Sequence, residues 1–297
     1  MAQTVNVAFD EFLKDYVNLD IKDTAKARNS RDWLIEEQIH SFPYKDLYFP
    51  RFYSEKDIYF GSFARRTKKR PLDDIDIMIA LSAEGSTYYE YTNGVIEMYV
   101  PDSAYKLKML CNDDTNTLNS RKILNKFKYL LSKVPQYQEA DIKTNLEAVT
   151  LKLKSYTWNF DIVPCFFTNP ELSGRTYYLI PDGKGNWKKT DPRIDRYRVT
   201  EVNQAHNGNV LNVIRLMKFW NKRQTMPSMG SWQQVINRRI PSQELERESY
   251  ILQNQIYDNR RLSPLIFDWL YSRLKKQNEE QMNKGAEVLI KELLQTP

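Results

Sequence analysis

The N-terminal part of the chain changes from a helical to an extended pattern of hydrophobic positions. Apolar residues recur at helical spacing over residues 5–41, and Pro43 marks the end of this pattern, which predicts helix. Residues 57–81 predict a strand, a Gly-Ser turn, a basic loop and a second, strongly apolar strand. A helical segment therefore leads into a sheet.

Further along the chain, the pattern mixes strands and helices before it becomes helical. It predicts, in order, a hairpin around Asn93-Gly94 within residues 86–100, a helix from Asp113 to about Lys133, two strands within residues 145–167, a strand pair over residues 176–190, and mostly helix after about residue 203. No linker-like segment interrupts the chain. We therefore expect an α+β protein with two closely packed parts, at residues 1–200 and 201–297.

The segment from Asp74 to Leu81 places charge at the start of an apolar strand. Side chains alternate between the two faces of a strand, so Asp74 and Asp76 point the same way, and the apolar face with Ile75 and Ile77 lies opposite. Two adjacent carboxylates repel each other unless a cation compensates, and oxygen ligands of this kind favour Mg²⁺ or Mn²⁺. The pair therefore predicts a metal site, and a solvated strand end is the alternative.

Other residues strengthen the hypothesis of a metal site. Gly61 permits a tight turn, and Ser62 supplies a hydroxyl and an N–H group suited to a phosphate oxygen. Asp161 lies in the apolar run YTWNFDIVPCF, where an unpaired carboxylate is costly, and a two-metal site needs a further carboxylate from a neighbouring strand. Asp161 is therefore predicted to be a metal ligand and general base, with a strand-end contact as the alternative. The basic run at residues 68–70 is interpreted as a solvated loop rather than a triphosphate contact.

Composition narrows the possible chemistry. The chain of 297 residues is 41% hydrophobic and 28% charged, and its net charge of +6 suits an anionic substrate as well as a lysine-rich surface. It has only two cysteines and two histidines, too few for a structural zinc site. The N-terminus lacks the apolar core of a signal peptide and no apolar run is long enough to span a bilayer, so we expect a cytoplasmic protein with no membrane partner.

The order of short motifs resembles a known enzyme family. The motifs, in chain order, are Gly61-Ser62, ARRT at residues 64–67, Pro71-Leu72, DID at residues 74–76, FDIVP, IPDGKGNW, TDPR and IRLMKFWN. This order is similar to that of the bacterial CD-NTases, relatives of cyclic GMP-AMP synthase and oligoadenylate synthase, over about residues 55–240. The resemblance implies a polymerase-β-like nucleotidyltransferase core with a mixed sheet, packed against a helical C-terminal lobe that closes the nucleotide cleft.

The resemblance also implies further nucleotide-binding residues. It places a triphosphate-binding lysine at Lys218, with a solvated basic stripe as the alternative. The helix around Lys218 has a predicted apolar face of Val213, Leu216, Met217 and Trp220. Ser231 would contact the triphosphate, with Ser228 as an alternative match, and Trp232 would either stack on the base or lie in a core.

The function implied by the resemblance is template-independent joining of nucleoside triphosphates into a cyclic or short linear oligonucleotide second messenger. Asp74, Asp76 and Asp161 would hold two Mg²⁺ ions, or Mn²⁺, and no zinc. The expected substrates are ATP, GTP or pyrimidine triphosphates, with no obligatory DNA activator and with regulatory proteins as possible partners. Bacterial relatives serve in cyclic-oligonucleotide-based anti-phage signalling. The alternatives are an RNA-tailing, protein-modifying or antibiotic-modifying nucleotidyltransferase, and a non-catalytic nucleotide or RNA sensor.

Overall fold

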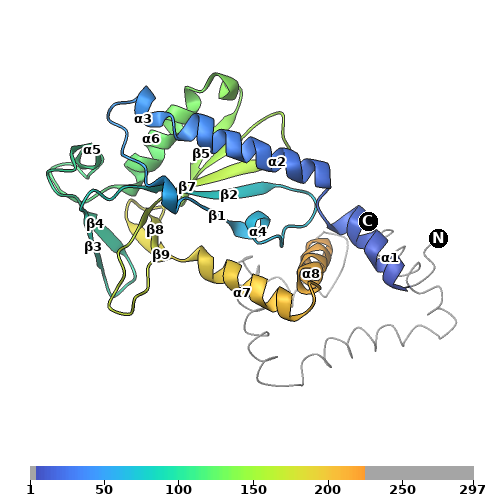
Figure 1. Cartoon of the computed structure of the whole chain (residues 1–297). Coiled ribbons are helices and arrows are strands. Elements are labelled where there is room, and N and C mark those ends of the chain that lie inside the picture. Colours follow the sequence, from blue (N-terminus) through green and yellow to red (C-terminus); the bar gives the residue numbers. More distant parts are fainter. Residues whose placement is uncertain (1–4, 225–297) are drawn as a thin grey trace. The chain divides into compact units, whose positions relative to one another are not determined.

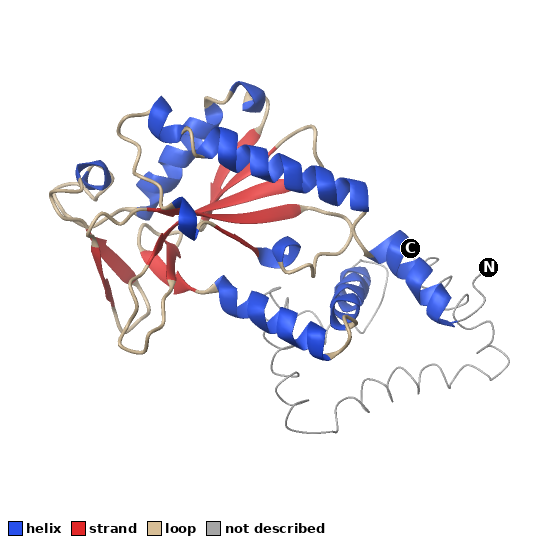
Figure 2. Cartoon of the chain, viewed as in Figure 1, coloured by secondary structure: helices blue, strands red, loops and turns tan. Residues whose placement is uncertain are grey.

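A β-sheet with helices packed against it forms the main part of the structure (Figures 1 and 2). The computed structural model describes residues 5–224. The strands are β1 Ile58–Phe60, β2 Asp74–Leu81, β3 Thr87–Glu90, β4 Ile96–Tyr99, β5 Asp141–Asn145, β6 Ala148–Lys152, β7 Asn159–Phe167, β8 Tyr178–Pro181 and β9 Trp187–Thr190. The α-helices are α1 Val5–Phe12, α2 Ile21–Trp33, α3 Phe42–Lys45, α4 Gly61–Ala64, α5 Tyr105–Lys108, α6 Ser120–Ser132, α7 Pro192–Ala205 and α8 Val210–Gln224. π-Helical segments follow α1 at Leu13–Val17 and α2 at Leu34–Ile39, and short 3₁₀ turns lie at Ser54–Lys56 and Pro135–Tyr137.

The sheet is mixed, as predicted. Its nine strands follow the order β1-β2-β7-β8-β9-β4-β3, with β6 beside the first part of β7 and β5 beside β6. Only β2 and β7 are parallel among these strands, and the other pairs are antiparallel. The α+β class is therefore confirmed. Most of the predicted C-terminal helical lobe, from residue 225 onward, lies outside the described residues.

The chain divides into two compact units, each with its own core. The unit Asn18–Arg215 holds the whole sheet. The other unit includes α1, the π-helical segment Leu13–Val17 and the part of α8 from Leu216 onward. Its described core consists of Phe12, Leu13 and Val17, against which Leu216 and Phe219 pack.

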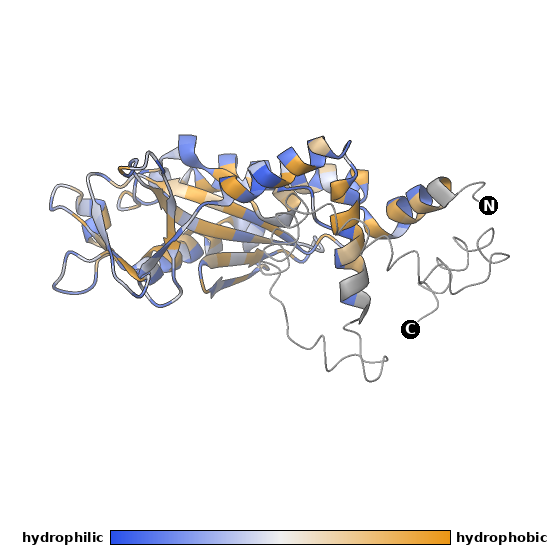
Figure 3. Cartoon of the chain, turned by 90° about the horizontal axis from the view of Figure 1, so that it is seen from below, coloured by the Kyte–Doolittle hydropathy of each residue, from blue (hydrophilic) through white to orange (hydrophobic). Residues whose placement is uncertain are grey.

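Hydrophobic residues are buried on both faces of the central strands. Figure 3 shows the predominantly hydrophobic colouring of these strands. Ile75, Ile77 and the later residues of the same face belong to the large core that also includes residues of α2 and α6. On the opposite face, Met78 and Ala80 are buried in a second, smaller core. The face that carries Asp74 and Asp76 is therefore open only where the strand begins, rather than along its whole length.

Most predicted elements are confirmed, with a few shifts. The two strands within residues 57–81, the β3–β4 hairpin and the strand regions around β6–β7 and β8–β9 are all present. The predicted Gly-Ser turn forms the start of the one-turn helix α4. β5 was missed because its sequence DIKTN is polar. The helix α7 begins at Pro192, earlier than the predicted change to helix near residue 203.

The helix predicted from Asp113 begins later, at Ser120. Asn119 caps it by accepting two backbone N–H groups at 2.9 and 3.2 Å. The preceding residues form a turn in which the N–H of Asn112 donates to the Thr117 carbonyl at 2.8 Å. The apparent helix start at Asp113 is thus a loop, because the capping side chain that satisfies the free N–H groups lies further along the chain.

Two buried tryptophans allow a matched test of this core. Trp187 is fully buried, and its Nε1 donates to the Leu118 carbonyl at 3.0 Å. Trp158 is also buried, but its Nε1 has no hydrogen-bond partner among the described residues. We expect Trp187→Phe to lower the free energy of unfolding by about 1–3 kcal/mol more than Trp158→Phe, because only the first leaves a carbonyl unpaired. Urea denaturation measures both, and equal losses would contradict the assignment.

Candidate active site

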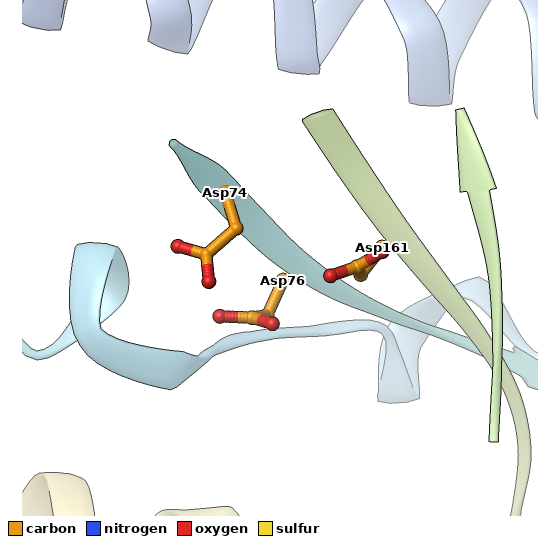
Figure 4. Close-up of side chains that lie close together, drawn as sticks. All are labelled: Asp74, Asp76 and Asp161. Atoms are coloured by element: carbon orange, nitrogen blue, oxygen red, sulfur yellow. The ribbon is translucent and has the colours of Figure 1, made fainter. Parts of the chain in front are cut away.

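The parallel pairing of β2 and β7 brings the three predicted carboxylates together. Asp76 on β2 is the register partner of Asp161 on β7, and Asp74 lies two residues earlier on the same face of β2. One carboxylate oxygen from each residue lies within 4.8 Å of the other two, and Figure 4 shows the side chains directed toward a common space. Among the described residues, this is the one such group of acidic, histidine or cysteine side chains that could hold a metal ion.

The donor set indicates the kind of ion. All three groups are carboxylates, and their oxygens are the ligands that Mg²⁺ and Mn²⁺ prefer. All three are partly exposed, so water and substrate oxygens can complete the coordination of an ion held there. The residues therefore fit a divalent-metal site of the nucleotidyltransferase type.

Gly61 places the Gly-Ser turn directly against Asp76. Its φ of +70° lies in the left-handed region that favours glycine, and a Cβ at this position would lie only 1.7 Å from Asp76 Oδ2. The carbonyl of Ser62 accepts the N–H groups of Thr67 at 2.9 Å and Lys68 at 3.0 Å, which folds the basic loop back onto the turn. The predicted phosphate-binding turn and the carboxylates are thus neighbours.

Burial and mutual repulsion disfavour a fully ionised cluster. Burial, first of all, and the negative charges of Asp74 and Asp161 together raise the pKa of Asp76 to about 7. Burial also raises the pKa of Asp161, and a hydrogen bond from Thr150 opposes this rise. A divalent cation would relieve both effects, because it stabilises the ionised carboxylates.

Thr150 is a site residue that the sequence analysis missed. It is the register partner of Asp161 on β6, and its Oγ1 donates to Asp161 Oδ1 at 2.6 Å. This hydrogen bond leaves the other carboxylate oxygen available to a ligand. The sequence does show a hydroxyl residue inside an alternating strand, but the partner becomes evident only once the register of β6 and β7 is known.

The basic run at residues 68–70 is not a solvated loop, and this interpretation was wrong. The Lys68 side chain is only 11% exposed, and its Nζ forms ion pairs with Asp73 and Asp74. Burial lowers the pKa of Lys68, but the hydrogen bonds to the two carboxylates raise it by more, so the net shift is upward. Lys69 Nζ donates to the Arg70 carbonyl, and Arg70 Nε donates to the Asn18 carbonyl. The run is therefore anchored to the protein at each position.

The remaining predicted residues lie in α8 or beyond it. Lys218 is in the part of α8 that belongs to the smaller unit. Ser231 and Trp232 lie outside the described residues, and so does the side chain of Trp220. Of the predicted apolar face, Leu216 packs against the small core, but Val213 and Met217 are 54% and 49% exposed. Phe219, which was not assigned to this face, packs against the small core together with Leu216, so the buried face of α8 differs in part from the predicted one.

Comparison with known proteins assigns the chain to a family. A protein of Bacillus cereus (strain VD146) named "Probable cyclic nucleotide synthase" is 52% identical over 222 residues, which cover 74% of this chain. The chain belongs to the CD-NTase family. The matched residues span 66% of that relative, just under two thirds of its length.

A solved structure agrees with the fold. The structure of E. coli MS115-1 CdnC with ATP matches with a TM-score of 0.52 at 18% identity, covering 85% of this CD-NTase and 67% of that chain. The complex of E. coli MS115-1 CdnC with HORMA-deltaN matches with a TM-score of 0.47 at 18% identity, covering 74% and 58%. The first match supports the polymerase-β-like nucleotidyltransferase fold.

A family model matches the C-terminal part. The model of the SMODS-associating 4TM effector domain matches residues 221–289, almost all of which lie outside the described residues. Within residues 5–224, no helix has both the length and the apolar character that a membrane span requires.

The close approach of Gly61 to Asp76 gives a sharp test. Gly61→Ala must both strain a left-handed backbone position and displace the Asp76 carboxylate, so we expect loss of divalent-metal binding. Gly94→Ala is the matched control, because Gly94 has a similar φ of +76° but open space around the missing Cβ. Calorimetric titration with Mn²⁺ compares the two variants, and unchanged binding by Gly61→Ala would refute the geometry.

The raised pKa of Asp76 makes the metal-free protein sensitive to pH. Between an unfolded pKa near 4 and the folded pKa of about 7, the folded state holds a proton that the unfolded state has lost, so stability falls as pH rises through this range. Asp76→Asn resembles the protonated form and should raise the melting temperature in EDTA at pH 8, with a smaller gain at pH 5. Scanning calorimetry at both values tests this, and a gain that does not depend on pH would count against it.

Proposed function

We propose that this CD-NTase joins nucleoside triphosphates, without a template, into a cyclic or short linear oligonucleotide second messenger. The observation that carries the proposal is the register of β2 and β7, which sets Asp161 beside Asp76 and next to Asp74. The name of the Bacillus cereus relative supports a cyclic nucleotide product. The E. coli CdnC structure with ATP supports nucleoside triphosphates, such as ATP, GTP or pyrimidine triphosphates, as the substrate class.

The carboxylates divide the chemical work. Asp74, Asp76 and Asp161 would hold two Mg²⁺ ions, or Mn²⁺, which when bound acidify the acceptor hydroxyl and neutralise charge on the leaving pyrophosphate. Asp161 would accept the proton of a sugar hydroxyl while the hydroxyl oxygen bonds to the α-phosphorus. The bond from that phosphorus to the bridging oxygen then breaks, and pyrophosphate leaves.

Other residues would bind the triphosphate. Gly61 and Ser62 stand next to the carboxylates and would hold phosphate oxygens through the hydroxyl and backbone N–H groups of the turn. Lys218 would neutralise the β- and γ-phosphates. Ser231 and Trp232 would contact the triphosphate and the base. In this proposal the core at residues 1–200 provides the carboxylates and the Gly-Ser turn, and the part at residues 201–297 provides Lys218, Ser231 and Trp232.

The biological setting is proposed from the comparisons. The match to a SMODS-associating effector domain supports a role in cyclic-oligonucleotide-based anti-phage signalling. We place the enzyme in the cytoplasm, where nucleoside triphosphates are available. We also predict a regulatory protein partner and an activity that does not require DNA as an activator.

The proposed activity can be tested directly with the four labelled nucleoside triphosphates and Mg²⁺, without RNA. We expect release of pyrophosphate and a product that resists phosphatase, both abolished by EDTA and restored by Mg²⁺ or Mn²⁺. The double variant Asp74→Asn/Asp76→Asn should lose this activity and remain folded. Asp102→Asn is the matched control, since the Asp102 side chain is 91% exposed and lies outside the cluster. Normal turnover by the double variant would exclude the site.

Asp161 is expected to affect chemistry more than binding. Asp161→Asn keeps the shape of the side chain but loses its charge, so product formation should fall by at least about 10²-fold, the usual contribution of a general base. Affinity for a non-hydrolysable triphosphate should stay close to normal, because Ser62 and the other two carboxylates remain. Calorimetry for binding and chromatography for product test both parts. An Asn variant with normal turnover would leave Asp161 a purely structural residue.

A further inference from the structure

Lys68 occupies an unusual position at the edge of the candidate metal site. Its Nζ bridges Asp74, which belongs to the cluster of three carboxylates, and Asp73, which does not. The Lys68 side chain is 11% exposed, whereas the Asp73 side chain is 57% exposed. The ammonium therefore lies between a carboxylate of the cluster and a more exposed carboxylate outside it.

The backbone holds Lys68 in this position. Its N–H donates to the Ser62 carbonyl at 3.0 Å, and the preceding residue, Thr67, is buried and donates to the same carbonyl at 2.9 Å. The loop therefore cannot carry Lys68 away without breaking its contacts with the Gly-Ser turn. The flexible side chain can move instead, since its four methylene groups allow the ammonium to leave one carboxylate and stay with the other.

A divalent ion and an ammonium compete for the same carboxylate. Mg²⁺ binds carboxylate oxygens at about 2.0–2.1 Å, and a second positive charge in contact with Asp74 would repel it at short range. Asp73 offers the ammonium a second partner outside the cluster. The geometry thus contains both the contact with Asp74 that competes with the metal and a contact with Asp73 that the lysine can keep.

We propose that Lys68 is a displaceable counter-cation, which pairs with both Asp74 and Asp73 in the absence of metal and keeps only its contact with Asp73 when a divalent ion binds. The proposal rests on the proposed metal site and adds a residue that sets its affinity. The positive charge of the lysine offsets the negative charge of the carboxylates when no metal is bound. It therefore weakens metal binding by the free protein, which favours loading of the ions together with the nucleotide.

The test is metal binding without nucleotide, measured by calorimetric titration with Mn²⁺. We expect Lys68→Met to lower the dissociation constant for Mn²⁺ about tenfold, which corresponds to the loss of a competing ion pair worth about 1.4 kcal/mol. It should also lower the melting temperature in EDTA. Lys69→Met is the matched control, because it removes the same charge from the next residue, whose Nζ donates to the Arg70 carbonyl. Lys68→Gln provides a second variant, and circular dichroism verifies the fold of each.

A double-mutant cycle tests the displacement itself. Asp73→Asn removes the outer partner, so it should weaken Mn²⁺ binding more in the wild-type background than in Lys68→Met. Equal effects in both backgrounds, or equal Mn²⁺ affinities of Lys68→Met, Lys68→Gln and the wild type, would overturn the displacement. A wild-type protein that binds no Mn²⁺, or binding that Asp161→Asn leaves unchanged, would instead overturn the metal site itself.

Discussion

The parallel pairing of β2 with β7 is the constraint on which the rest of the site depends. Side chains alternate along a strand, so a shift of one residue in this register would turn Asp161 to the opposite face and separate it from Asp76. Both faces of the later part of β2 are buried, which anchors the strand and its register. The open end of the same strand is then free to carry charge. Packing at one end thus supports chemistry at the other.

Charge compensation shapes the surroundings of the carboxylates. Burial alone would favour protonation of Asp76 and Asp161, which would make them poor metal ligands. Thr150 and Lys68 offset this cost in different ways, one by a neutral hydrogen bond and one by a positive charge. The site therefore combines a permanent support on β6 with a cation on a neighbouring loop. Neither residue is among the three ligands, yet both determine how readily the ligands ionise.

The sequence predicts the carboxylates well and their supports poorly. Asp74 and Asp76 follow from strand alternation together with the Gly-Ser element before them, and Asp161 follows from the cost of a lone charge in an apolar strand. Thr150 depends on the register between two strands, which pairs residues distant in sequence. Lys68 was assigned to solvent, because a run of three basic residues gives no sign that one of them turns inward. The buried face of α8 was misplaced because it is set by contacts with Phe12, near the N-terminus.

The backbone at Gly61 also limits how long the side chain at residue 76 can be. The Asp76 carboxylate fills the space that a Cβ would take, so the backbone of the turn acts as a fixed stop for this side chain. Glutamate is one methylene longer, and its carboxylate would have to bend away from the stop or push the turn aside. The turn therefore favours aspartate over glutamate at residue 76 by reach alone. Redesign of this site for a larger ion would have to begin with the turn rather than with the ligands.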